Sequence, residues 1–360
     1  MISKLKDNIE LLKKDSKEIQ SKIGIGSTLK LPNLSNLDFE GNSIIKISEG
    51  KKTQKNLDKI DSKFLDNTWN DEISNSYIEG LSFGNLNYFE LEGNDNLKLD
   101  LFSEDSLKAN SEIIIINCKN NYSGEIIIKK SGVSKYFQDT LRVLVNEGAN
   151  VKLIFVDDVN SNSNSFSYNT FKVNKNSILD IKRVFMGSGF NYSKIKCFQN
   201  SSNVKISSLI LSKEVSQKFL DIKINQENKN NNSDVKIKGI CDDSAKIISR
   251  SNINISKDAK EGSAYESIDF LNLSENCESD MMPFLEINNP NISCSHRATI
   301  ELVDEDKLFY LQSRGLSKED SKNLIVDSFI RNEINSLPES IREDVLGKIS
   351  LNFMEGKHEI

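Results

Sequence analysis

A short pattern of apolar, charged and apolar residues recurs through the middle of the chain and limits the folds open to it. It follows a polar turn each time and begins at Val151, Leu179, Val204 and Val235, at steps of 28, 25 and 31 residues. Alternating residues form strands with one buried face, and such steps hold about two strands each. The pattern predicts a β-solenoid whose coils stack around an apolar column. A sandwich of ordinary hairpins is the alternative.

Composition agrees with a globular protein. Of the 360 residues, 37% are hydrophobic and 28% are charged, which is enough apolar material to bury a sizeable core. The 47 basic and 53 acidic residues give a net charge of −6, so no broad basic surface for nucleic acid is expected. With 17 Gly and 4 Pro, collagen-like and proline-rich classes are excluded.

Changes in the periodicity of apolar residues divide the chain into three parts. Residues 1–84 are predicted to be mostly helical, with helices over 2–23 and 51–81 and a loop with short strands between them. Strand-like alternation dominates 85–305, and helical spacing returns over 306–360.

The C-terminal part contains a second apolar stripe. Ser317 is predicted to cap a helix whose first turn is acidic, and another short helix is expected over 339–352. The stripe consists of Leu324, Ile325, Phe329, Ile330 and Ile334. The helices either pack on the end of the β-domain or offer a docking surface for a partner.

Two features favour a cytoplasmic location. The first residues are charged and lack the apolar core of a secretory signal, and the longest apolar run, at 113–116, is far too short to cross a bilayer. The five cysteines are odd in number and irregularly spaced, which favours reduced thiols over a disulfide framework. No membrane partner is expected.

Motifs for catalysis are missing from the sequence. It contains no G-x-x-x-x-G-K-[ST], H-E-x-x-H, G-x-S-x-G or C-x-x-C. We therefore expect no P-loop nucleotide chemistry in this chain. Only two histidines are present, His296 and the near-terminal His358.

One group of residues carries ligand chemistry. Cys277, Cys294 and His296 fall within twenty residues, and thiolate and imidazole suit iron, zinc or an iron–sulfur cluster. Cys294 and His296 would share one face of a strand. Three ligands leave a tetrahedral site incomplete, so the group predicts an open or labile site, or one that a second chain completes. The alternative is that these cysteines are small buried hydrophobes. Cys118, Cys197 and Cys241 are assigned to the core.

The segment around these residues has a recognisable form. Residues 283–315 read PFLEINNPNISCSHRATIELVDEDKLFYLQSRG. This closely resembles the C-terminal signature of the SufB/SufD family of iron–sulfur cluster assembly proteins, with its P-x-L-E-I, C-S-H-G-A-T and F-Y-x-x-S-R-G motifs. The resemblance is specific over 235–340 and weaker over 85–235.

The resemblance implies a right-handed parallel β-helix with helical parts at both ends. It also implies a cytoplasmic scaffold that handles a transient iron–sulfur cluster and binds no nucleotide itself. The scaffold would work with the ABC-type ATPase SufC. It would also pair with a second SufB/SufD-type subunit, either a paralogue or a second copy. A cysteine desulfurase is an expected sulfur donor, and the role of a flavin stays open. The residues that would contact the ATPase are Phe309, Tyr310, Arg314, Leu324, Ile325, Phe329 and Ile330.

Site residues carry over by position. His296 matches the histidine of C-S-H, Cys294 matches its first residue, and Cys277 stands where SufB-type chains have their interface cysteine. Arg297 replaces the glycine of the motif and is a candidate modulator, either favouring a thiolate or pairing with an acid such as Glu301. The chain thus mixes SufB-like and SufD-like features. A purely structural partner subunit and a β-helix enzyme acting on polysaccharides are the alternative functions.

Overall fold

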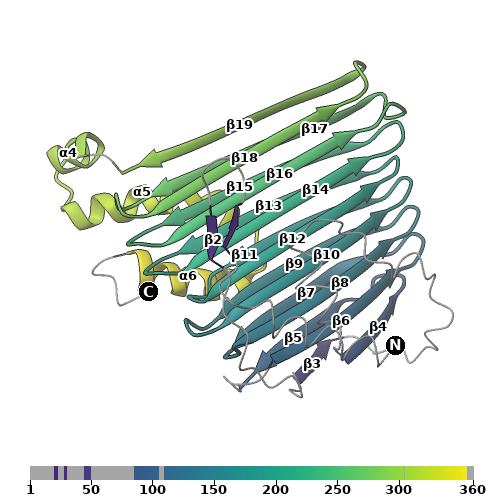
Figure 1. The fold of residues 1–360 in the computed structure, drawn as a ribbon, viewed down its shortest axis with the longest axis horizontal. Coiled ribbons are helices and arrows are strands. Elements are labelled where there is room, and N and C mark those ends of the chain that lie inside the picture. Colours follow the sequence, from purple (N-terminus) through teal and green to yellow (C-terminus); the bar gives the residue numbers. More distant parts are fainter. Residues whose placement is uncertain are drawn as a thin grey trace.

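The computed structural model describes residues 20–22, 28–30, 44–49, 85–104, 109–303 and 305–354. Within these residues, two long sheets face each other and successive strands alternate between them (Figure 1). Each strand of these two sheets therefore pairs with strands two elements away rather than with its chain neighbour. This arrangement is a β-solenoid with two strands per coil, as the repeated pattern predicts, and it excludes the hairpin sandwich.

The strands have the following bounds. The first sheet contains β4 (Asn85–Leu91), β6 (Ala109–Cys118), β8 (Tyr136–Val145), β10 (Asn164–Val173), β12 (Phe190–Gln199), β14 (Gln217–Gln226), β16 (Lys246–Ile255) and β18 (Glu278–Ile287). The second contains β3 (Ile44–Glu49), β5 (Leu97–Ser103), β7 (Ser123–Gly132), β9 (Asn150–Val159), β11 (Ile178–Phe185), β13 (Asn203–Ser212), β15 (Asn232–Cys241), β17 (Gly262–Asn272) and β19 (Ile292–Leu302). Neighbours are parallel except for the antiparallel pair β3 and β5.

The register follows the repeated pattern with one shift. Leu179 pairs with both Val151 and Val204, in adjacent coils. Val204, however, pairs with Ser233, so Val235 lies two positions further along and pairs with Ile206. The first residues of the two strands, Asn203 and Asn232, are themselves paired, so the shift lies within β15, where the buried Ser233 takes the position that Val204 holds in β13.

Inward-facing residues of both sheets form one continuous core. Leu179 is fully buried in it, whereas its neighbour Ile178 is 43% exposed. We expect Leu179→Ala to lower the free energy of unfolding by about 2–5 kcal/mol, because it leaves a cavity between two coils. Ile178→Ala is the matched control and is expected to change stability by less than about 1 kcal/mol. Urea unfolding followed by circular dichroism measures both, and equal losses would contradict this packing.

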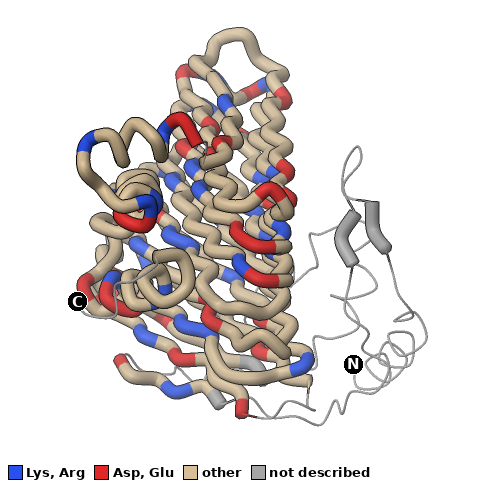
Figure 2. The backbone as a smooth tube through the Cα atoms, turned by 90° about the vertical axis from the view of Figure 1, so that its left-hand side faces the viewer, with Lys and Arg blue, Asp and Glu red and all other residues tan. Residues whose placement is uncertain are grey.

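Three helices follow the last strand: α4 (Glu305–Ser313), α5 (Lys318–Asn335) and α6 (Glu339–Phe353). Helices α5 and α6 lie along the outer face of the odd-numbered sheet, not on the end of the β-domain (Figures 1 and 2). Outward-facing apolar residues of that sheet, such as Val184 and Leu209, need cover and pack against Val326, Ile330 and Ile334. This side-on placement differs from the predicted end-on packing.

Ion pairs fix the positions of these helices along the sheet. Lys238 of β15 pairs with Glu333 of α5 at 3.1 Å, and its Nζ donates a hydrogen bond to the Phe329 carbonyl at 2.6 Å. Nearer the first coils, Lys129 of β7 pairs with Asp344 of α6 at 2.6 Å. Helix α5 therefore lies toward the last coils and α6 toward the first ones.

The N-terminal prediction falls largely outside the described residues. The predicted helices over 2–23 and 51–81 lie there, apart from Gln20–Lys22. Those three residues form strand β1, which pairs antiparallel with β2 (Thr28–Lys30), so the helical prediction is wrong for them. Pairing with the following segment supplies backbone hydrogen bonds that a helix end would lack. The division at 84 and 305 stays a prediction, and His358 is not described.

No helix among the described residues is long and apolar enough to cross a membrane.

Candidate functional site

In the part of the chain that the structure describes, no further coil stacks on the last coil of the solenoid. Strands β18 and β19 are the last members of their sheets, and within the described residues no further strand pairs with their outer edges (Figure 1). Side chains that would be covered by another coil are consequently open to solvent. Ile287 is 46% exposed, Ile300 is 47% exposed and Leu302 is 45% exposed. An open, partly apolar coil of this kind is a surface for association.

Cys277 lies at one end of this terminal coil, directly before β18. It is only 8% exposed and packs against the central core. Its Sγ donates to the carbonyl of Ser274 at 3.0 Å and lies 3.4 Å from the carbonyl of Cys241. Cys277 is therefore shielded in the isolated chain, with its thiol hydrogen-bonded to backbone.

Cys294 and His296 lie in the first half of β19 and share its inner face. Cys294 is partly buried against the core, and His296 is exposed. In the register with β17, Cys294 pairs with Ala264 and His296 pairs with Glu266. The predicted common face is thus confirmed.

The structure does not bring Cys277 to the other two residues. Strand β19 ends at Leu302, which lines the same cavity as Ser274. Cys277 is hydrogen-bonded to Ser274, so it lies at this end of the coil. His296 lies six residues before Leu302, which corresponds to roughly 20 Å of strand. No three His, Cys, Asp or Glu side chains in the described part of the chain gather closely enough to hold a metal ion. A single chain therefore presents two separated ligand groups, not one site.

Glu266 is a neighbour of His296 that the sequence did not single out. It is 3% exposed, and Ser251 Oγ donates to its Oε1 at 2.7 Å. Burial raises the pKa of this carboxyl to about 7. In the sequence, the one feature that could have drawn attention to Glu266 is a charged residue at a position of a strand that faces inward.

Arg297 lies on the opposite face of β19 from Cys294 and His296. Its guanidinium pairs with Asp269 at 2.9 Å and donates to Ser267 Oγ at 3.2 Å. Glu301 instead pairs with Lys307 at 3.0 Å. The acid partner of Arg297 is thus Asp269 in the adjacent coil rather than Glu301.

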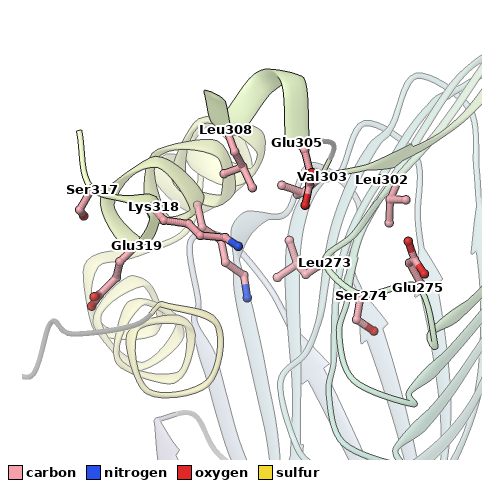
Figure 3. A pocket seen from close by; sticks show the side chains of 11 residues that line it. Leu273, Ser274, Glu275, Leu302, Val303, Glu305, Leu308, Ser317, Lys318 and Glu319 are labelled. Atoms are coloured by element: carbon pink, nitrogen blue, oxygen red, sulfur yellow. The ribbon is translucent and has the colours of Figure 1, made fainter. Parts of the chain in front are cut away.

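A cavity of about 710 Å³ adjoins the Cys277 end of the coil (Figure 3). The turn at Ser274 and Glu275 forms one wall, the end of β19 another, and the first turns of α4 and α5 the third. Its polar lining is of mixed charge, with Glu275, Lys318 and Glu319. The cavity is an approach to the turn that shields Cys277.

The residues predicted to contact an ATPase divide into two groups. Helix α4 has no buried residue, and Phe309 is 71% exposed and Tyr310 57% exposed on it. Arg314 lies over the Tyr310 ring at 5.4 Å, and Leu324 is 41% exposed. Ile330 lies on the face of α5 that meets the sheet and is fully buried, and Ile325 and Phe329 pack beside it. The first group forms an exposed surface, whereas the second holds α5 in place.

These observations define a class: a two-sheet β-solenoid with an open terminal coil that carries a shielded cysteine and an exposed histidine, followed by helices. The family model for the SUF system FeS cluster assembly SufBD core domain matches residues 101–329. The chain belongs to this SufBD family, as the resemblance of its C-terminal segment indicates.

Individual relatives share shorter segments with the chain. A protein of Staphylococcus saprophyticus is 36% identical over 109 residues, 30% of this chain and 23% of the relative. One from Archaeoglobus fulgidus is 39% identical over 106 residues, 29% of this chain and 28% of the relative. One from Galdieria sulphuraria is 28% identical over 165 residues, 45% of this chain and 75% of the relative. All three are named iron–sulfur cluster assembly SufBD family proteins. The chain spans only about a quarter of the length of the staphylococcal relative.

Proposed function

We propose that this protein is a non-catalytic scaffold subunit on which a transient iron–sulfur cluster is assembled. The observation that carries the proposal is the open terminal coil, with Cys277 at one end and His296 in the opposite half. Thiolate and imidazole are established ligands of iron–sulfur clusters. The family description, SUF system FeS cluster assembly, supports the same chemistry. The cluster is the cargo of this site, held only until it is passed on.

A second chain completes the site in this proposal. Two terminal coils that meet across a twofold axis continue both sheets when their edge strands pair. If β18 lies beside the partner's β18 and β19 beside the partner's β19, the strands run antiparallel. The Cys277 end of one coil then faces the Cys294–His296 half of the other. Pairing β18 with the partner's β19 would instead leave these groups at opposite ends.

The partner that this geometry favours is a second copy of the chain. Each copy carries both Cys277 and His296, so a symmetric pair forms two equivalent sites without a paralogue. The exposed apolar side chains of the terminal coil become buried in such an interface.

An ABC-type ATPase is the proposed second partner, bound at α4. This helix has no buried residue and begins three residues after β19 ends. A displacement of α4 by the ATPase would therefore act directly on the last strand of the terminal coil. Such a movement would open the interface and expose Cys277 to iron.

Substitutions on α4 and α5 are expected to separate docking from folding. Phe309→Ala with Tyr310→Ala should abolish co-purification of the ATPase while the free energy of unfolding changes by less than about 1 kcal/mol, because both side chains are exposed. Leu351→Ala is the matched control, since Leu351 is 70% exposed on α6 away from α4. Ile330→Ala should cost about 2–5 kcal/mol instead. Retention of the ATPase by the α4 variant would contradict docking at this helix.

The function is tested by anaerobic co-expression with the ATPase, followed by reconstitution with iron and sulfide. Broad absorbance near roughly 400 nm, from charge transfer between sulfur and iron, is the expected result. A stable complex without that absorbance would identify the chain as a structural partner subunit.

A further inference from the structure

Two cysteines of this chain lie in contact at the Cys277 end of the solenoid. Cys241 is the last residue of β15, and Cys277 directly precedes β18. Cys277 Sγ also lies 3.4 Å from the carbonyl oxygen of Cys241. Both are free thiols. The pair joins two adjacent coils of the solenoid.

The surroundings of the pair shield both sulfurs from solvent. Cys241 is fully buried, and its Sγ donates to the carbonyl of Ala245 at 3.3 Å, as Cys277 donates to Ser274. Ser274 also lines the cavity of about 710 Å³, so Cys277 is the member of the pair that lies next to a route from solvent. Cys294 lies in the opposite half of the coil and is remote from the pair.

We propose that Cys241 is the resolving thiol for sulfur delivered to Cys277. This inference rests on the proposed function, because it assigns a step to the same site. A persulfide or polysulfide donor converts the Cys277 thiol to a persulfide. The Cys241 sulfur then attacks the sulfur bonded to Cys277 Cβ, and the outer sulfur leaves.

The step balances as a thiol–disulfide exchange. The Cys277 persulfide and the Cys241 thiol become a Cys241–Cys277 disulfide and hydrogen sulfide. The bond between the two persulfide sulfurs breaks, and the new bond joins the two cysteines. The outer sulfur gains two electrons and leaves with both protons. A dithiol reductant of the cell returns the disulfide to two thiols. The pair thus supplies sulfur in the reduced form that cluster assembly requires.

The inference is tested on the reduced 360-residue chain, without iron, ATPase or a partner paralogue. The protein is treated anaerobically with sodium tetrasulfide, excess reagent is removed, and peptides are mapped by mass spectrometry. We expect wild type to gain a Cys241–Cys277 disulfide and to release sulfide. Cys241→Ser should instead retain one extra sulfur on Cys277 and release at least about tenfold less sulfide. Cys197→Ser, which changes another fully buried thiol, should behave as wild type.

Several outcomes would overturn the inference. A persulfide that accumulates on wild-type Cys277, or sulfide release that is unchanged in Cys241→Ser, removes the resolving role. Cys241→Ala provides the same test if serine disturbs the fold, which circular dichroism checks. If the Cys241–Cys277 disulfide forms normally but no cluster can be assembled, only the proposed function is overturned. Normal cluster formation without the disulfide would overturn only this inference.

Discussion

Asp139→Ala is expected to lower the free energy of unfolding by about 3–5 kcal/mol, because it leaves a buried ammonium without its counter-charge. Lys130 and Asp139 are both fully buried inside the solenoid, and Nζ lies 2.8 Å from Oδ1. The ammonium also donates to the carbonyl of Phe137 at 2.7 Å, and Ser167 Oγ donates to Asp139 at 2.6 Å. The backbone carbonyls of Phe137 and Phe166 that also accept from Lys130 carry no full charge to replace the lost carboxylate.

The pair is part of a larger group of interior charges. Arg183 lies between the rings of Phe155 and Phe185, at 3.7 and 4.8 Å from their centres. Its guanidinium donates to Ser167 Oγ at 3.0 Å and lies 3.6 Å from Asp157. Ser167 thus links the two ion pairs, and loss of Asp139 also disturbs the environment of Arg183.

Denaturant unfolding of matched variants checks this expectation. Asp234 forms an ion pair with Lys236 at the surface, so Asp234→Ala should cost less than about 1 kcal/mol. The double change Lys130→Met with Asp139→Leu should recover most of the lost stability, because it removes both charges and retains volume. A loss in Asp139→Ala no larger than in Asp234→Ala would show that the pair is not buried as described.

The second large effect concerns the cluster. Cys277→Ala and His296→Ala are each expected to reduce the absorbance near roughly 400 nm after reconstitution by at least tenfold, because each removes a ligand from both sites of a symmetric pair. Cys118→Ala is the matched control, since that thiol is buried in an early coil. Its absorbance should equal that of wild type.

The outcome that contradicts this ligand assignment is equally specific. Full absorbance in both variants, with an intact complex, would mean that the cluster lies elsewhere or that the chain is a structural partner. Circular dichroism distinguishes loss of ligands from loss of folding, and the exposed His296 makes a folding defect in His296→Ala unexpected.

The solenoid could be predicted from the sequence because apolar residues that are buried in successive coils recur at a nearly regular spacing. Val151, Leu179 and Val204 mark consecutive coils in true register. The step to Val235 overshoots the true register by two residues, because the apolar pattern begins two positions later in β15 than in β13. The placement of α5 was not predictable either. Its apolar stripe shows that it is buried, but not that the outer face of the odd-numbered sheet covers it.

The candidate site was predicted only in part. Cys277 and His296 are close in sequence, yet a strand that crosses the whole coil separates them. Cys241 is confirmed as a core residue, but its contact with Cys277 joins residues 36 positions apart and depends on the stacking of coils. Glu266 came to notice only through its register with His296. Long-range register is the information that a single sequence does not contain.

The most direct test of the central claim mixes two variants. Copies that carry Cys277→Ala are paired with copies that carry His296→Ala, distinguished by different tags, and the hetero-pair is purified and reconstituted. A site formed between chains is intact once in such a pair, so we predict about half of the wild-type absorbance, although each variant alone shows almost none. A hetero-pair as inactive as its parents would contradict a cluster site shared between the two terminal coils.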